Sequence, residues 1–163
     1  MTLDPLTDCA ALVGNRLREK GALLVTAESC TGGWVAQAIT AIAGSSEWFE
    51  RGFVAYSNAA KQELLGVRRE TLEGHGAVSE ATARELALGA LQHSKGTISV
   101  AVTGIAGPAG GTADKPVGLV CFAWATQDGI RSEFRHFDGD RESVRRQSVV
   151  RALQGVLETL DSA

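Results

Sequence analysis

Apolar side chains recur at helical spacing in several parts of the chain, and short continuous apolar runs lie between them. Apolar positions three or four residues apart predict amphipathic helices, whereas the short runs predict buried strands. The expected helices run from Leu6 to Leu17, from Val35 to Ile42, from Asn58 to Leu65, from Ser79 to Leu91 and from Asp140 to Leu160. The expected strands cover residues 22–25, 53–56, 97–102, 117–126 and 130–137.

The order of these elements predicts the fold. Helices and strands alternate at first, whereas the last strands follow one another directly. Asp128-Gly129 separates the last two strands and is typical of a hairpin, so part of the sheet is expected to be antiparallel. Residues 67–78 show no periodic pattern and are expected to be irregular. The sequence therefore predicts an α/β protein: a single three-layer α/β/α domain over residues 1–163, around a mixed, mostly parallel sheet of about five strands.

Composition and charge narrow the range of partners. The formal net charge of the 163 residues is -3, so the composition does not indicate a basic surface that binds nucleic-acid phosphates. Asp4 and Asp8 precede the first basic residue, Arg16, and no apolar run is long enough to span a bilayer. We therefore expect a cytoplasmic protein that binds neither nucleic acid nor a membrane.

The cysteines and histidines argue against two familiar kinds of site. Cys9, Cys30 and Cys121 are odd in number and far apart, so they predict neither a disulfide framework nor a zinc site. The histidines have no acidic partner at a recognisable offset, so no Ser-His-Asp triad is indicated. No metal is expected.

Two glycine-rich turns are the first candidates for a binding site. One follows the first expected strand and the other follows the third, and turns at the carboxyl ends of parallel strands rim a common pocket. The polar and glycine residues that these turns offer are Ser29, Thr31, Gly32, Gly33, Thr103 and Gly104. Helix capping and simple chain reversal explain either turn equally well. Neither matches the common nucleotide-binding fingerprints.

A serine, a tyrosine and a lysine form a second candidate group. Lys61 follows the expected cap Asn58 by three residues, so its charge opposes the positive end of a helix dipole. That opposition lowers the pKa of a lysine and suits a general base for Ser46, with Tyr56 nearby in the sequence. A solvated lysine and a tyrosine that fills the strand end are the alternative interpretation.

Two arginines supply candidate anion ligands. Arg141 and Arg145 lie four residues apart on the last expected helix, so they share a face and can clamp a phosphate or carboxylate. A solvated basic face paired with surface acids is the more ordinary interpretation.

Seven stretches, in the same order, resemble one known family. They are residues 26–33, 43–49, 52–61, 75–79, 103–108, 115–118 and 139–145. In this pattern the chain resembles the stand-alone nicotinamide-nucleotide amidases, which are similar to the C-terminal domain of the CinA proteins. The resemblance implies hydrolysis of the carboxamide of nicotinamide mononucleotide to nicotinate mononucleotide and ammonia, within pyridine-nucleotide salvage.

The resemblance also implies roles for the candidate residues. The family is described as serine amidases with a lysine base, so Ser46 is the first choice of nucleophile, Lys61 the base and Tyr56 a proton relay or orienting group. Ser29 is the rival nucleophile because it lies in the better anion-binding turn. Arg141, Arg145 and the Thr103-Gly104 turn are candidates for the phosphate. No cofactor is required.

Two further expectations concern the whole molecule. The first is that the protein forms a homo-oligomer, a dimer, for which an apolar surface near Trp34, Trp48 and Phe49 is a candidate, although Trp48 and Phe49 fit a core better. The second is the rival function: a non-catalytic module that binds a pyridine nucleotide or a protein linked to competence.

Overall fold

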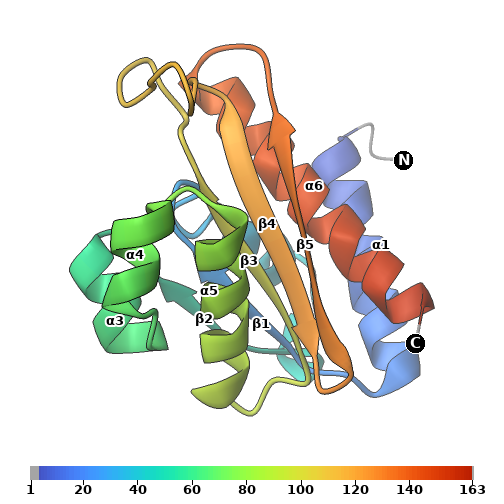
Figure 1. Cartoon of the computed structure of the whole chain (residues 1–163). Coiled ribbons are helices and arrows are strands. Elements are labelled where there is room, and N and C mark those ends of the chain that lie inside the picture. Colours follow the sequence, from blue (N-terminus) through green and yellow to red (C-terminus); the bar gives the residue numbers. More distant parts are fainter. Residues whose placement is uncertain (1–3, 163) are drawn as a thin grey trace.

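Five strands form one mixed sheet at the centre of the molecule, and the computed structural model describes residues 4–162 (Figure 1). The strands are β1 (Leu24–Glu28), β2 (Phe49–Val54), β3 (Ile98–Gly104), β4 (Leu119–Thr126) and β5 (Gly129–His136). The helices are α1 (Pro5–Lys20), α2 (Trp34–Thr40), α3 (Asn58–Leu65), α4 (Arg69–His75), α5 (Glu80–Gln92) and α6 (Arg141–Asp161), with a short 3-10 turn, η1 (Ser45–Glu47).

The strand order is β2-β1-β3-β4-β5. The strand β1 pairs in parallel with both β2 and β3, whereas β4 runs antiparallel to β3 and to β5. Only β4 therefore opposes the common direction of the described strands, and β1, β2 and β3 finish at the same end of the sheet. The mixed sheet and the hairpin at Asp128-Gly129 confirm the fold predicted from the sequence.

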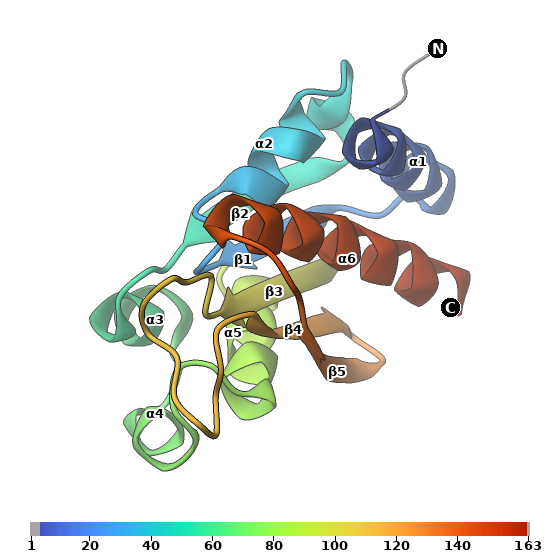
Figure 2. The ribbon, with the colours of Figure 1, turned by 90° about the horizontal axis from the view of Figure 1, so that it is seen from above.

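Helices cover both faces of the sheet (Figure 2). On one face, α1, α2 and α6 bury a core that includes Trp48, Phe122 and Trp124. On the other face, α5 packs with α3 and α4 over small side chains such as Ala101 and Ala123. Alternate residues of a strand point to opposite faces, which is how β3 and β4 serve both cores. Trp48 is 1% exposed and belongs to the core, as its sequence context suggested.

Side-chain caps define where the longer helices begin. Asp140 Oδ1 accepts a hydrogen bond from the Ser143 N–H at 2.9 Å at the start of α6. At α3 the cap is Ser57, whose hydroxyl accepts from the Ala60 N–H at 3.0 Å, and not Asn58 as expected. Lys61 therefore lies one position further into the helix than predicted, where the helix dipole acts on it less strongly.

Two further expectations about local structure were wrong. Residues 67–78, expected to be irregular, contain α4, a short helix held partly by the Glu85 carboxylate, which accepts from the Arg68 N–H at 2.9 Å. The second strand spans Phe49–Val54, earlier than expected, because its pairing with β1 extends back to Phe49. Tyr56 therefore lies beyond the strand. Among residues 4–162, no helix combines the length and apolar character needed to cross a membrane.

Candidate active site

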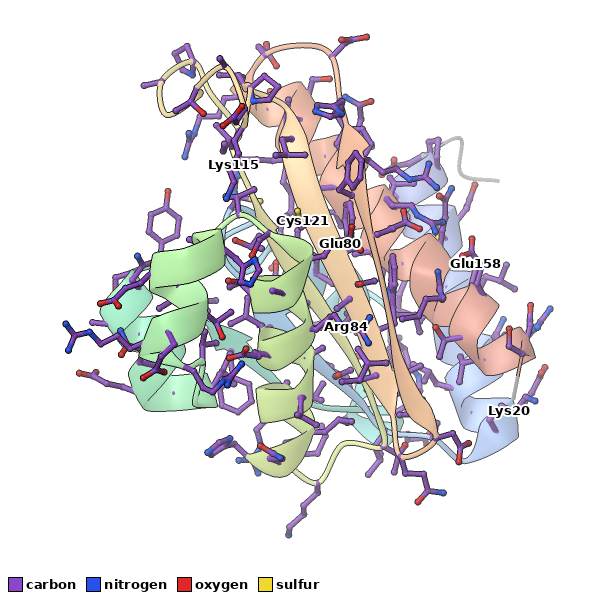
Figure 3. The ribbon with its side chains drawn as sticks, in the orientation of Figure 1. Lys20, Glu80, Arg84, Lys115, Cys121 and Glu158 are labelled. Atoms are coloured by element: carbon purple, nitrogen blue, oxygen red, sulfur yellow. The ribbon has the colours of Figure 1, made fainter. Side chains whose placement is uncertain are left out.

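A cavity of about 270 Å³ lies at the end of the sheet where β1 and β3 finish. The loop of residues 105–118 folds over this end, where Figure 3 shows Lys115, whereas Lys20 marks the opposite end. The residues that line the cavity are Ser29, Cys30, Tyr56, Asn58, Lys61, Ala77, Val78, Thr103, Gly104, Ile105, Ala106, Gly107, Ala109, Gly110 and Arg141. The cavity therefore brings both glycine turns together with Tyr56, Lys61 and Arg141.

The turn after β1 presents Ser29 to the cavity. Gly32 and Gly33 have φ angles of 58° and 100°, a backbone conformation that favours glycine, and they turn the chain into α2. Ser29 is buried, and its backbone N–H donates to the Val102 carbonyl at 3.0 Å. Within residues 4–162 its hydroxyl has no hydrogen-bond partner. The turn thus holds a serine rigidly while leaving its hydroxyl free for a ligand.

The buried carboxylate of Glu28 anchors this turn, a role that the sequence analysis missed. Its Oε1 accepts hydrogen bonds from the Thr31 hydroxyl at 2.6 Å and the Val35 N–H at 2.8 Å. Its Oε2 accepts from the Ala36 N–H at 3.0 Å. The carboxylate therefore supplies the partners that the first N–H groups of α2 otherwise lack. The only sequence signal was an acid placed directly before a glycine turn and a helix.

Arg145 stabilises the same turn by donating hydrogen bonds to two of the turn's carbonyl groups. Its Nε donates to the Cys30 carbonyl at 3.0 Å, and its Nη2 donates to the Thr31 carbonyl at 3.0 Å. The guanidinium also lies over the Trp34 ring, 5.3 Å from its centroid. Arg145 does not line the cavity. The structure therefore separates Arg145 from Arg141, although both were candidates for the same anion.

The buried Lys61 amine makes a single hydrogen bond to the residues that the structure describes. Its side chain is 2% exposed, and Nζ donates to the Tyr56 carbonyl at 2.9 Å. Burial lowers the pKa of Lys61 from its ordinary value of 10.5, because desolvation disfavours the ammonium form. The sequence analysis expected this direction but assigned it to the helix dipole. A neutral amine can keep its hydrogen bond to Tyr56 and still accept a proton.

Tyr56 and Arg141 lie together at the mouth of the cavity. Tyr56 is 61% exposed, and its hydroxyl accepts from Arg141 Nη2 at 3.3 Å. Arg141 Nη1 donates to the Gly107 carbonyl at 2.8 Å, which ties α6 to the loop after β3. Arg141 therefore places a positive charge at the exposed side of the cavity.

The turn after β3 supplies the opposite wall. Thr103 is buried, and its hydroxyl donates to the Ala77 carbonyl at 2.8 Å. A Cβ at Gly104 would approach the Leu119 carbonyl oxygen to 3.0 Å, so the close packing of this turn against β4 requires glycine. The N–H groups of Ala106 and Gly107 donate to no other described residue. They are available to an anionic group in the cavity.

The structure does not bring Ser46 to this cavity within one chain. Ser46 lies in η1, immediately before β2, whereas Ser29 and Thr103 lie at the ends of their strands. Because β1 and β2 are parallel, Ser46 is at the opposite end of the sheet, where it is exposed. The first-choice nucleophile and the lysine are therefore separated by the length of β2.

The Cys30 thiol and the question of a metal site complete the description of the cavity. Burial raises the pKa of the Cys30 thiol to about 12, so this cavity-lining cysteine stays protonated and is a poor nucleophile. Among residues 4–162, no three His, Cys, Asp or Glu side chains gather where they could hold a metal ion.

A larger cavity, of about 890 Å³, lies at the other end of the sheet. Ile98, Trp124 and Leu160 line it together with Lys20 and Arg131. The Arg131 guanidinium is already engaged, because Nη2 donates to the Gly155 carbonyl at 3.1 Å and the group lies 4.3 Å from the Trp124 ring centroid. This cavity offers volume but no grouping of nucleophile and base.

Comparison with known proteins agrees with the resemblance seen in the sequence. The model of the CinA C-terminal domain matches residues 6–160. Nicotinamide-nucleotide amidohydrolase PncC of Escherichia coli (strain K12) is 55% identical over 155 residues, which cover 94% of this chain and 94% of that protein. The protein of the same name from Pseudomonas putida is 49% identical over 156 residues, covering 96% of this chain and 98% of that protein.

A solved structure extends the agreement to the fold. The crystal structure of the competence/damage inducible protein CihA from Agrobacterium tumefaciens matches with a TM-score of 0.93 and 45% sequence identity, over 99% of each chain. The matched residues include both glycine turns, Lys61 and Arg141. The chain therefore belongs to the CinA C-terminal domain family.

Proposed function

We propose that this protein hydrolyses the carboxamide of nicotinamide mononucleotide, which yields nicotinate mononucleotide and ammonia. The names of the relatives from Escherichia coli and Pseudomonas putida support this activity. The observation that carries the proposal is the free Ser29 hydroxyl in the same small cavity as the buried Lys61 amine. Serine hydrolysis of an amide requires both groups, a nucleophile and a base with a lowered pKa.

Ser29 is the proposed nucleophile and Lys61 the proposed base. Neutral Lys61 takes the hydroxyl proton as Ser29 Oγ attacks the carboxamide carbon. The π electrons of the C=O bond move to oxygen and form a tetrahedral oxyanion. The pyridinium ring of the substrate withdraws electrons from the carboxamide, and its positive charge disfavours a protonated lysine nearby. Both effects favour attack at neutral pH.

The backbone of the second turn is proposed to hold the oxyanion. The Ala106 and Gly107 N–H groups are unengaged within the described residues and belong to the cavity wall. Preorganised N–H donors of this kind stabilise the charge that develops in acyl transfer. When the carbonyl re-forms, the C–N bond breaks and Lys61 returns the proton to the departing nitrogen as ammonia. The product bound to Ser29 is a nicotinate ester.

Water then completes the reaction. Lys61 removes a proton from water as the water oxygen attacks the ester carbon, and the same proton passes to Ser29 Oγ as the C–O bond breaks. Nicotinate mononucleotide leaves, and Ser29 and neutral Lys61 are restored. The site therefore needs no proton store beyond one lysine.

The remaining residues divide between the substrate and the turn. Arg141, at the mouth of the cavity, is proposed to bind the substrate phosphate, because a guanidinium forms strong paired hydrogen bonds with phosphate oxygens. Tyr56 orients Arg141 through its hydroxyl. Arg145, Thr31, Gly32 and Gly33 are proposed to position Ser29 rather than to touch the phosphate.

The test is ammonia and nicotinate mononucleotide release from nicotinamide mononucleotide by the wild type, Ser29→Ala and Lys61→Ala. The matched control is Ser99→Ala, because Ser99 is fully buried in β3 but outside the cavity, with its hydroxyl bonded to the Ala87 carbonyl at 2.7 Å. Circular dichroism first checks that each variant is folded. We expect turnover in the wild type and Ser99→Ala, and a loss of about 10³-fold or more in the other two.

Two outcomes would contradict the proposal in different ways. If the folded wild type forms no product but is stabilised against heat by the nucleotide, the chain is a binding module and not an amidase. If Ser29→Ala retains wild-type turnover, the activity stands and the assigned nucleophile is wrong.

A further inference from the structure

The side-chain amide of Asn58 is a free polar group in the lining of the smaller cavity. The capping role that the sequence suggested for Asn58 is taken by Ser57, whose hydroxyl accepts from the Ala60 N–H at 3.0 Å. Within residues 4–162, the Asn58 amide makes no hydrogen bond, and the residue is exposed. Its oxygen and its NH2 group are therefore both available to a ligand.

Asn58 lies on the same face of α3 as the proposed base. Asn58 and Lys61 are three residues apart, and both line the cavity. Lys61 is 2% exposed whereas Asn58 is exposed, so Asn58 is the outer of the two. Side chains of a helix lean toward its N-terminus, which is why the Lys61 amine reaches the Tyr56 carbonyl at 2.9 Å. Asn58 therefore lies outward of that amine, toward the exposed side of the cavity.

The other polar side chains of the cavity are occupied. The side chains of Thr103 and Arg141 each donate to a backbone carbonyl at 2.8 Å. The Tyr56 hydroxyl accepts from Arg141 at 3.3 Å. Of the lining side chains with oxygen or nitrogen atoms, only those of Ser29 and Asn58 make no hydrogen bond within the described residues. Because Ser29 is the proposed nucleophile, Asn58 is the free group left to recognise another part of the substrate.

We propose that Asn58 binds the ribose of the substrate and makes the site specific for a ribonucleotide. This inference rests on the proposed amidase function. The ribose joins the pyridinium ring to the phosphate, so it occupies the part of the cavity between the proposed base and Arg141. An amide side chain has an acceptor oxygen and two N–H donors. The NH2 group donates to one of the 2′ and 3′ hydroxyl oxygens, and the other hydroxyl donates to Oδ1.

The neutral charge of Asn58 also suits this position. A carboxylate there would raise the pKa of Lys61 by favouring its ammonium form, and it would repel the substrate phosphate. An amide recognises two hydroxyl groups without either effect. The same residue can therefore contribute to specificity while leaving the lysine neutral.

The test compares nicotinamide mononucleotide with its 2′-deoxy and 3′-deoxy analogues, in the wild type and in Asn58→Ala. We expect wild-type kcat/KM to be about tenfold lower for each analogue, because each loses a hydrogen bond and leaves part of the amide unpaired. In Asn58→Ala this preference should fall to less than about twofold, since the partner of the hydroxyl groups is already absent. For nicotinamide mononucleotide itself, kcat/KM of the variant should fall by about tenfold.

The matched control is Gln62→Ala, in the next turn of the same helix. Gln62 is exposed, lies outside the cavity lining and donates to the Asn58 carbonyl at 3.4 Å. We expect Gln62→Ala to keep the tenfold preference for the ribonucleotide. Alanine favours helix, and the Ser57 cap remains in both variants, so both should fold, which circular dichroism checks. If Asn58 only stabilised α3, its removal would lower turnover of all three substrates alike and leave the preference unchanged.

Binding measurements separate this inference from the proposed function. Calorimetry with Ser29→Ala and with the double variant Ser29→Ala/Asn58→Ala gives Kd for the same three nucleotides without turnover. We expect each analogue to bind about tenfold more weakly than nicotinamide mononucleotide in the first protein, and less than about twofold more weakly in the second. If the wild type binds the nucleotide without hydrolysing it, the proposed function fails, whereas the Kd ratios still decide the role of Asn58.

Three results would overturn the inference. The first is a wild type that does not distinguish the ribonucleotide from either analogue. The second is a preference that survives in Asn58→Ala. The third is a folded protein that binds none of the three nucleotides.

Discussion

Two basic side chains are buried among residues 4–162, and their surroundings shift their pKa values in opposite directions. Lys61 in the cavity is 2% exposed, and within residues 4–162 its amine contacts no polar group except a carbonyl, so burial lowers its pKa. Arg151, between α6 and β5, is 6% exposed and donates to Glu133 at 2.7 Å and to Glu158 at 2.7 Å. These hydrogen bonds, above all those with Glu133, raise the pKa of Arg151.

The difference separates a reactive group from a structural one. A buried cation held by carboxylates has its charge compensated and resists any change of protonation. A buried amine with only a carbonyl partner loses its proton more easily and can act as a base. A single fold thus uses desolvation for chemistry at one place and ion pairing for stability at another.

The largest expected effect on turnover comes from replacing the lysine of the cavity with an arginine, the residue type found in the ion-paired cluster. Lys61→Arg puts a permanently charged guanidinium in the cavity, so it removes the base without removing the positive charge. We expect kcat for nicotinamide mononucleotide to fall by about 10³-fold. Lys20→Arg, at the opposite end of the sheet, is the control and should retain wild-type kcat. Substantial turnover in Lys61→Arg would show that Lys61 is not the base.

Removing Arg151 from its ion pairs with Glu133 and Glu158 should lower the stability of the fold and leave turnover unchanged. Arg151→Met leaves Glu133 without its main partner, and we expect urea unfolding to show a loss of about 3 kcal/mol with kcat unchanged. The pKa of Glu133 is lowered from 4.5 to about 2, first by its hydrogen bond to Arg151. Its contribution to stability is therefore complete above 4.5 and is lost as the pH falls toward about 2.

The acid sensitivity of unfolding gives a second readout for the same variant. Because Arg151→Met returns the pKa of Glu133 toward its ordinary value, the variant should lose less additional stability in acid than the wild type. Equal losses in both proteins between pH 4.5 and about 2 would mean that the ion pair does not set the acid sensitivity.

The pH dependence of kcat/KM tests the lowered pKa of Lys61 in the cavity. Only neutral Lys61 can accept a proton, so kcat/KM should rise about tenfold per pH unit below the pKa of Lys61 in the free enzyme and then level off. Since burial lowers that pKa, the plateau should begin at a lower pH than an ordinary lysine would give. A plateau at the pKa of an exposed lysine would contradict the effect of burial.

The smallest expected effect distinguishes the two arginines that the sequence analysis treated alike. Arg141→Ala should raise KM by about tenfold or more with little change in kcat, because it removes a phosphate ligand. Arg145→Ala should instead lower kcat and the melting temperature, because it releases the Cys30 and Thr31 carbonyls. Steady-state kinetics and thermal unfolding of both variants measure this, and identical profiles would remove the distinction.

Sequence patterns predicted the sheet and both glycine turns because they are local signals. Apolar runs and glycine turns mark β1 and β3, and Ser29 and Thr103 each follow such a run. The helix α4 was missed because it has no apolar stripe. Only Thr71 is buried among its seven residues. The cap of α3 was misplaced by one residue, because Ser57 and Asn58 are both good capping residues.

The site was harder to predict because it depends on direction and burial. Ser46 precedes its strand whereas Ser29 follows one, a difference in sequence that places them at opposite ends of parallel strands. The burial of Lys61 depends on packing by segments far away in the chain and has no local signal. The role of Glu28 emerges only when its carboxylate meets the N–H groups of α2.

The most direct test of the central claim is to locate the acyl group formed during turnover. The protein is mixed with nicotinamide mononucleotide, quenched with acid within the first turnover and mapped by peptide mass spectrometry, with Ser29→Ala assayed for ammonia release in parallel. We predict a nicotinate mononucleotide ester on Ser29, and neither ester nor turnover in Ser29→Ala. An ester on Ser46, or wild-type ammonia release by Ser29→Ala, would contradict the proposed chemistry.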